Sequence, residues 1–157
     1  PILTRALPQS RSGRILGDLK KAVAEGQRVY WICPVIGDTE SSNLMSAEAR
    51  YREFCEIFPG RTGLVHGRID AAMRQEILDK FSSGELAVLI STTVVEVGLD
   101  VPEASVMVIE QAERFGLAQL HQLRGRVGRG EHASRCYLLH SDDIGAQAKD
   151  RLFTICN

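Results

Sequence analysis

Hydrophobic and polar positions alternate in two different rhythms along this chain of 157 residues. Short, nearly unbroken apolar runs are separated by longer segments in which apolar residues recur every three or four positions. The unbroken runs are typical of strands buried on both faces, and the spaced segments are typical of amphipathic helices. Strands that alternate with helices in this way predict a mainly parallel sheet with helices on both faces. We therefore expect a three-layer α/β/α fold.

The same pattern predicts where the elements lie. Pro34 comes late in the first apolar run and should end that strand, while Ser46 and Asp70 are suited to cap helices. The chain begins at Pro1 without a methionine and stops at Asn157 within an amphipathic pattern. We expect one domain over 1–157, excised from a longer chain, with irregular or truncated ends at 1–10 and 150–157. Strands are predicted at 29–36, 62–66, 87–91, 105–110 and 135–140, and helices at 11–25, 46–58, 70–81 and 117–127.

Composition narrows the class of protein. A hydrophobic content of 44% can fill one core, and a net charge of −1 excludes nucleic-acid binding through bulk charge while leaving a local basic strip open. The four cysteines include no Cys-x-x-Cys pair, which indicates reduced, mostly buried thiols of a cytoplasmic protein. His132 and Cys136 could share a metal, but nothing nearby completes four ligands, so we expect none. No apolar run approaches the ~20 residues of a membrane span.

The most informative segment is QLHQLRGRVGRG, at 119–130. A glycine inside a helix costs about 1 kcal/mol relative to alanine, so the glycines of this predicted helix indicate close packing or a close ligand. Arg126 and Arg129 are three residues apart and should project from one face. Two guanidinium groups on one face suit a nucleotide phosphate. A basic last turn favoured by the helix dipole is the structural alternative, and it explains the arginines but not the glycines.

Two further segments follow predicted strands, and the carboxyl ends of parallel strands are where open α/β sheets bind ligands. In STTVVEVGLDVP, at 91–102, Thr92 could hold a phosphate and Asp100 could accept a hydrogen bond from a ribose. Taken alone, the segment favours a capped turn that ends at Gly98, because capping explains Thr92 and Gly98 equally well. In LVHGRIDAAMR, at 64–74, Gly67 permits close approach of a backbone, and the following helix N-terminus attracts phosphate. His66 closes that strand and is interpreted as structural.

Several motifs are absent. The sequence has no G-x-x-x-x-G-K-[ST] segment to cradle phosphates, no pair of acids at a strand end for Mg²⁺, and no G-x-G-x-x-G dinucleotide signature. The missing dinucleotide signature argues against a Rossmann-type enzyme with a small-molecule cofactor. The chain thus carries arginines that could complete an ATP site, but not the site itself.

Taken together and in order, these segments resemble the second RecA-like lobe of superfamily 2 helicases, most closely that of the RecG family of branched-DNA helicases. The resemblance covers about 29–139. Two of its segments, at 88–110 and 112–130, are shared with the transcription-repair coupling translocase, whose lobe is the alternative within the motor class. The segment YWICPVIGDTES, with a polar loop after the first strand, favours the RecG family.

The resemblance implies a nucleotide role for five residues. Arg126 and Arg129 correspond to the two arginines that reach across a cleft to the γ-phosphate of ATP bound by the first lobe. Gln122 corresponds to the polar residue that senses the phosphate end. Gly98 and Asp100 correspond to the part of the motif beside the ribose.

It also implies contacts with DNA. Thr92 corresponds to the hydroxyl that touches the backbone of the tracked strand. Gly67 and Arg74 correspond to the segment whose helix start contacts a DNA phosphate, with His66 positioning the backbone there. These contacts involve the DNA backbone rather than the bases.

Coupling and partners are implied as well. Glu96 and Gln119 are assigned to coupling between the nucleotide state and DNA grip, whereas Leu123 stands where the family often has arginine and leaves the role of Arg124 open. ATP and Mg²⁺ would be held mainly by the first lobe, so this chain alone should not hydrolyse ATP. The expected partners are that lobe and a wedge domain of the same parent chain, together with forked or branched DNA, in a monomeric protein of the bacterial cytosol. A helicase-like module that only docks a partner is the other alternative, and the retention of Arg126, Arg129 and Asp100 argues against it.

Overall fold

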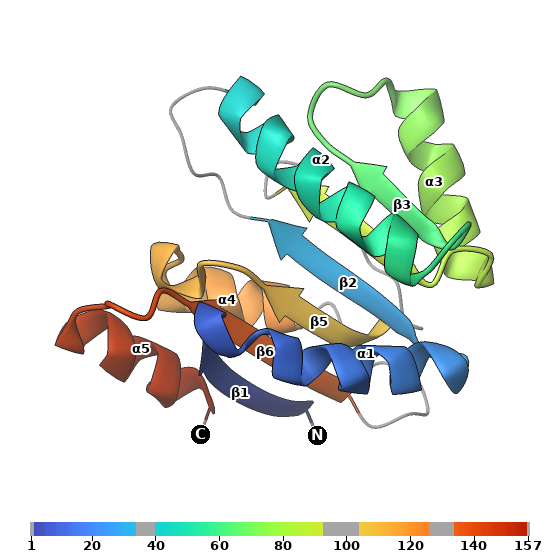
Figure 1. Cartoon of the computed structure of the whole chain (residues 1–157). Coiled ribbons are helices and arrows are strands. Elements are labelled where there is room, and N and C mark those ends of the chain that lie inside the picture. The colour runs from blue at the N-terminus through green and yellow to red at the C-terminus, as the bar shows by residue number, and fades with distance from the viewer. Residues whose placement is uncertain (1, 34–39, 93–103, 126–133, 157) are drawn as a thin grey trace.

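The computed structural model describes residues 2–33, 40–92, 104–125 and 134–156. Their strands form one parallel sheet in the order β1-β6-β5-β2-β4-β3 (Figure 1). The strands are β1 (Ile2–Pro8), β2 (Arg28–Cys33), β3 (Thr62–Val65), β4 (Val88–Thr92), β5 (Ala104–Ile109) and β6 (Ser134–His140). The helices are α1 (Gly13–Ala24), α2 (Glu40–Ile57), α3 (Ala71–Ser83), α4 (Leu117–Arg124) and α5 (Ala146–Cys156), with 3-10 turns η1 (Gln9–Arg11) and η3 (Ala112–Arg114).

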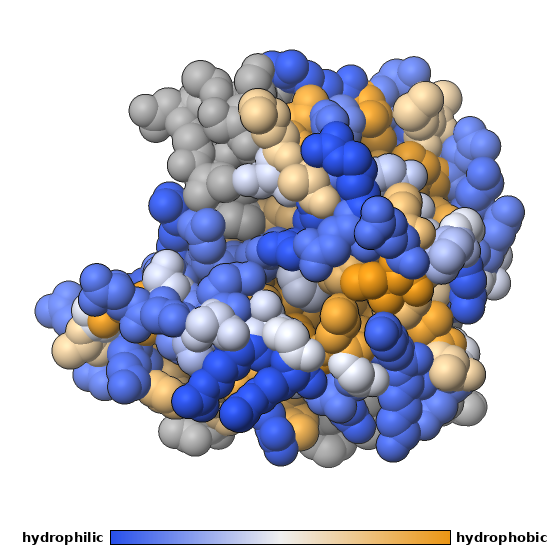
Figure 2. Space-filling view, in the orientation of Figure 1, coloured by the Kyte–Doolittle hydropathy of each residue, from blue (hydrophilic) through white to orange (hydrophobic). Residues whose placement is uncertain are grey.

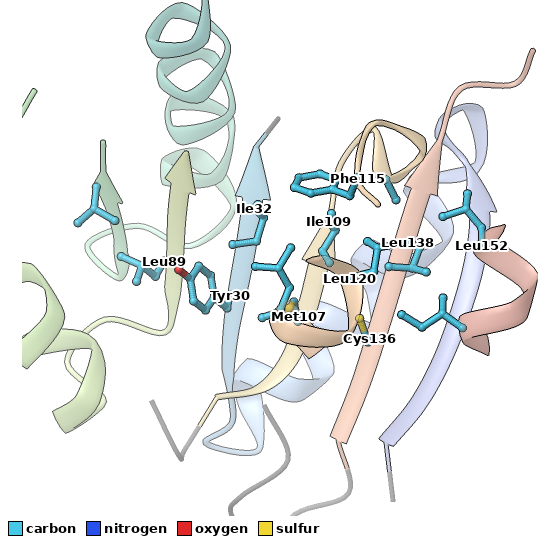
Figure 3. Close-up of a cluster of buried hydrophobic side chains, with 14 of the residues drawn as sticks. Tyr30, Ile32, Leu89, Met107, Ile109, Phe115, Leu120, Cys136, Leu138 and Leu152 are labelled. Carbon is cyan, nitrogen blue, oxygen red and sulfur yellow. The ribbon is translucent and has the colours of Figure 1, made fainter. Parts of the chain in front are cut away.

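Helices cover both faces of the sheet, which confirms the α/β fold with a parallel sheet. On one face α1 and α2 pack on the strands, and on the other α3, α4 and α5 do so. The surface on the α1 and α2 side is largely hydrophilic, with a hydrophobic strip visible between the two helices (Figure 2). The opposite cluster, shown in Figure 3, joins alternate residues of the strands to the helices beneath them; it includes Tyr30, Ile32, Leu89, Met107, Ile109, Phe115, Leu120, Cys136, Leu138 and Leu152.

The central strands are buried on both faces, as their unbroken apolar runs predicted. Residues 29–33 of β2 and 88–92 of β4 are all buried. The cap of α3 is confirmed, because Asp70 Oδ1 accepts a 2.7 Å hydrogen bond from the Met73 amide. Gly84 ends the same helix in the left-handed region, with φ of 89°. No helix within the described ranges has the length and apolar character of a membrane span.

One expectation about the ends of the chain is wrong. Residues 2–8 are not irregular but form β1, which pairs in parallel with β6 from Ile2–Ser134 to Pro8–His140. An edge strand has one unpaired side, and here Thr4 is buried while Leu3 is 52% exposed, so no apolar run marks it. At the other end, residues 150–156 belong to α5, which buries Leu152 and Ile155 as the amphipathic pattern indicated.

Helix α2 also begins earlier than predicted. It starts at Glu40, so Ser46 lies inside the helix and does not cap it. Met45 is 72% exposed, so this apolar residue does not mark the face of α2 that packs on the core.

Candidate functional site

The carboxyl ends of four neighbouring strands bring chemistry-bearing residues into one row. Cys33 pairs with Thr92 across β2 and β4, and the Val65–Ser91 pair places His66 next to Thr92. The Ile32–Ile109 pair places Glu110, the residue after β5, next to Cys33. The row therefore runs across the sheet as His66, Thr92, Cys33 and Glu110.

This row crosses a topological switch point of the sheet. The neighbouring strands β2 and β5 are followed by α2 and α4, which cover opposite faces. In open α/β sheets the crevice at such a point, outside the carboxyl ends of the strands, is the usual ligand site. The row thus lies at the edge where the sequence placed its candidate residues.

The turn between β3 and α3 is held by local hydrogen bonds. His66 Nδ1 accepts a 3.1 Å hydrogen bond from the Arg68 amide, which supports the structural interpretation of this histidine. Gly67 is exposed, and Asp70 caps the helix that follows. Arg74 is half-buried in the first turn of α3, and its Nε has no hydrogen-bond partner among the described residues. The turn therefore presents an exposed glycine and the N-terminus of a helix, the two features on which the expected contact with a DNA backbone depends.

Thr92 ends β4 and is only 3% exposed. Its Oγ1 is buried and has no hydrogen-bond partner in the described part of the chain, while its carbonyl accepts a 2.9 Å hydrogen bond from Ser91 Oγ. A buried hydroxyl without a partner costs about 1–3 kcal/mol, so this atom is a candidate for a further contact. Glu96, Gly98 and Asp100, predicted in the following segment, lie outside the described residues.

Helix α4 contains most of the described part of the arginine segment. Gln119 Oε1 accepts a 2.9 Å hydrogen bond from the Gly116 amide and so satisfies the helix start. Gln122 is exposed, whereas Leu123, which departs from the family pattern, is buried in the core at 3% exposure. Gln119 is thereby given a capping contact, and no coupling contact is seen among the described residues.

Arg124 has a structural role that the sequence left open. Its Nη1 donates a 2.8 Å hydrogen bond to the Ile155 carbonyl of α5 and lies 3.4 Å from Thr4 Oγ1 of β1. Its Nη2 lies 3.3 Å from His121 Nδ1. This arginine links α4 to α5 and β1. Its guanidinium group is therefore engaged within the protein rather than available to a ligand.

The predicted helix 117–127 ends at Arg124, so the argument from glycines inside it is wrong for Gly125. That residue is the C-cap with ordinary helical angles, and a Cβ there would meet the Gln122 carbonyl at 3.4 Å, the upper limit of a tight contact. Among the described residues, no close packing explains the glycine at this position. Arg126 and Arg129 lie outside the described residues, as do the remaining glycines of the segment.

Sequence reasoning missed a partly buried ion pair between Glu110 of this row and Arg50 of α2. The Glu110 carboxylate accepts hydrogen bonds from Arg50 Nη2 at 2.6 Å and Arg50 Nε at 3.2 Å. Trp31 Nε1 donates to the same carboxylate at 2.6 Å, and the Cys33 thiol lies 3.5 Å from it. Arg50 also lies over the Trp31 ring, 5.3 Å from its centroid, and pairs with the exposed Glu53 at 2.7 Å.

Burial and hydrogen bonds in this cluster shift the pKa values of Arg50 and Cys33. Burial acts to lower the pKa of Arg50, but the hydrogen bonds and negative charge of Glu110 outweigh it and raise that pKa. Burial and the nearby Glu110 charge raise the pKa of the Cys33 thiol, which stays protonated. In the sequence, the one signal for this ion pair was Glu110, an acid that directly follows an apolar strand run. Nothing in the sequence marked Arg50 as its partner.

The described residues show neither a disulfide nor a group of metal ligands. All four cysteines are unpaired; Cys33 and Cys136 are buried, and Cys55 and Cys156 are half-buried. Within the described ranges, no three His, Cys, Asp or Glu side chains are grouped as metal ligands. His132 lies outside those ranges.

Comparisons with known proteins agree with this geometry. The family model described as "Helicase conserved C-terminal domain" matches residues 14–131. The chain is 45% identical over 97% of its length to the ATP-dependent DNA helicase RecG of Acidithiobacillus ferridurans, and 46% identical over 97% to that of Escherichia coli K12. It spans about a fifth of the length of these curated relatives, covering 22% of each.

Comparison with solved structures also finds a RecG protein. A structure of RecG bound to a three-way DNA junction matches 99% of this chain and 20% of its own, with a TM-score of 0.82 and 38% identity. Saccharomyces cerevisiae Dbp5 bound to RNA and ADP BeF3 matches 98% of this chain and 37% of its own, with a TM-score of 0.68. At 18% identity the second match supports the fold alone.

Proposed function

We propose, from the premise that this chain belongs to the helicase conserved C-terminal domain family, that it is the second motor lobe of a RecG-type ATP-dependent helicase acting on branched DNA in repair and recombination. The observation that carries the proposal is the identity of 45–46% to RecG helicases over 97% of the chain. The arrangement of the row at the carboxyl edge supports it, since that edge is where such a sheet binds ligands.

The nucleotide role rests on the arginine segment. Because the chain has no phosphate-cradling loop, ATP and Mg²⁺ are assigned mainly to a first lobe, and this lobe supplies Arg126 and Arg129. When the lobes close, these guanidinium groups stabilise charge that develops on the transferred phosphoryl group. Arginine fingers accelerate related reactions by about 10³ to 10⁵, or roughly 4–7 kcal/mol of barrier. Gln122, exposed on α4, and Gly98 and Asp100 complete the proposed nucleotide contacts.

The DNA role rests on the β3–α3 turn and on β4. Gly67 is exposed at the turn, and the start of α3 provides a favourable environment for a phosphate beside Arg74. The buried Oγ1 of Thr92, which has no hydrogen-bond partner among the described residues, reaches the DNA backbone only if its surroundings move when the lobes close on DNA. Contacts of this kind read phosphates, so binding should depend strongly on salt and little on base sequence.

The test is ATP turnover by the full-length protein with forked DNA. Arg126→Ala should reduce turnover about a thousandfold or more while ATP and DNA still bind. Arg52→Ala, which removes an exposed arginine of α2, is the matched control and should leave turnover unchanged. Near-normal turnover by Arg126→Ala would refute the finger assignment and favour a lobe that only docks a partner.

A further inference from the structure

Glu110 stands at the junction of two functional halves of the lobe. On one side it is held by Arg50 of α2 and Trp31 of β2, in the row that contains Thr92. On the other side the chain runs from Glu110 through Gln111 and η3 into α4, the helix that leads to the arginines. Gln111 has a φ of 48°, the one positive φ at a non-glycine residue in the described ranges, so the chain turns at this junction through a conformation that few side-chain-bearing residues adopt.

We propose that Glu110, held by Arg50, is a positioning residue that transmits DNA contact at the Thr92 row to the segment carrying the arginines. The inference rests on the proposed function and adds residues to it that neither the motifs nor the family pattern had singled out. Glu110 touches neither ATP nor DNA in this role. It acts by fixing α2 and the start of the η3–α4 segment to each other.

The contacts of the pair are those of a rigid joint. The Arg50 and Glu110 side chains are 24% and 11% exposed, and two guanidinium nitrogens engage one carboxylate in a fixed geometry. Trp31 contacts both members of the pair: its indole N–H donates to the Glu110 carboxylate, and its ring face lies under the Arg50 guanidinium. Because a buried pair is often no more stabilising than apolar residues of the same volume, stability alone is a weak reason for such a joint.

The Arg50–Glu110 pair lies between Thr92, where DNA contact is proposed, and α4, which leads to the arginines. A shift of α2 or of β2 must move the Glu110 carboxylate or break short hydrogen bonds at 2.6 Å. Cys33 lies next to Glu110 in the row and Thr92 lies one strand farther, so a phosphate drawn to Thr92 acts within two strands of the Arg50–Glu110 pair. Movement of Glu110 then passes directly along the chain to η3 and α4.

The test compares three variants of the full-length protein by the ratio of DNA-stimulated to basal ATP turnover. Glu110→Gln keeps the shape and removes the charge. Arg50→Lys keeps the charge and loses the two-pronged contact, and it serves if Glu110→Gln folds poorly. Glu53→Gln removes the exposed partner of the same arginine and is the matched control. The DNA dissociation constant and the melting temperature are measured alongside.

We expect Glu110→Gln to lower the stimulation ratio by about tenfold, the usual size of coupling between two sites, and Arg50→Lys to lower it in the same direction. Glu53→Gln should keep the basal turnover, the DNA affinity and the full stimulation ratio of the wild type. An unchanged ratio in both test variants, or an equal loss of basal and stimulated turnover, would overturn the positioning role. A wild-type protein without DNA-stimulated turnover would instead refute the proposed function, and the positioning role with it.

Discussion

Replacing Arg124 with glutamine should destabilise the 157-residue chain without touching the proposed phosphate contacts. The Arg124 Nη1 donates to the Ile155 carbonyl at 2.8 Å. That carbonyl lies in the last turn of α5, where the final four carbonyls have no partner within their own helix. Arg124 therefore caps α5 from a neighbouring helix, and the shorter glutamine cannot span the distance.

The size of the effect follows from the contacts. A hydrogen bond from a charged group contributes about 1.5–3 kcal/mol, and a cation at a helix C-terminus adds about 0.3–1 kcal/mol. The contact with Thr4 at 3.4 Å is long and that with His121 at 3.3 Å is exposed, so neither adds much. Since Arg124 is only half-buried, we expect a loss of about 2 kcal/mol in the free energy of unfolding.

Urea unfolding followed by circular dichroism measures this loss. With a slope of about 2 kcal/mol per molar, the midpoint should fall by about 1 M. Gln122→Ala, an exposed change two residues away on the same helix, should shift the free energy by less than about 0.5 kcal/mol. An Arg124→Gln midpoint equal to that of Gln122→Ala would show that the α4–α5 bond contributes nothing, and the structural assignment of Arg124 would be refuted.

Three further outcomes are expected in the same chain. Asp70→Ala removes the cap of α3 and should cost about 1 kcal/mol in thermal unfolding, whereas Asp70→Asn should restore most of it. Gly84→Ala puts a Cβ on a residue with φ of 89°, 2.9 Å from Arg28 Nη2, and should cost about 1–2 kcal/mol in urea, while Gly17→Ala, with open space around it, should not destabilise. Burial raises the pKa of Cys136 to about 12, and an unfolded thiol ionises near 8.5, so the unfolded chain loses its proton first as pH rises. The free energy of unfolding should then fall by up to about 1.4 kcal/mol per pH unit between about 9 and 12, and urea titrations of Cys136→Ala should lack this share of the slope.

The fold could be predicted where elements are buried on both sides. The runs of β2 and β4 were visible because helices cover both of their faces, and every residue from Val29 to Cys33 is buried. β1 was missed because an edge strand leaves Leu3 exposed beside a buried Thr4, a pattern that seven residues ending in proline do not reveal. The start of α2 was missed for a related reason, since the apolar Met45 is exposed and does not mark the face that packs on the core.

The candidate site divides along a similar line. Asp70 and His66 act within their own turn, through partners two or three residues away, and such local geometry can be recognised from spacing. Arg124 acts on Ile155, 31 residues later, and no local pattern separates it from the arginines that follow. Three arginines in one segment therefore looked alike in the sequence, although one of them has a packing role.

The Arg50–Glu110 pair shows why the remainder was out of reach. Its members are 60 residues apart, and they meet only because β5 pairs with β2 in one register and α2 returns over that face. A slip of one residue in that register would turn Glu110 toward α4 and leave Arg50 without its carboxylate. The identity of the pair thus depends on strand order and register, which apolar runs do not specify. What the sequence does specify is that an acid ends a buried strand, and a buried carboxylate requires a donor from elsewhere in the chain. That requirement makes Glu110 the residue through which changes on the α2 side reach α4, and it makes the stimulation ratio the quantity in which its role should be measured.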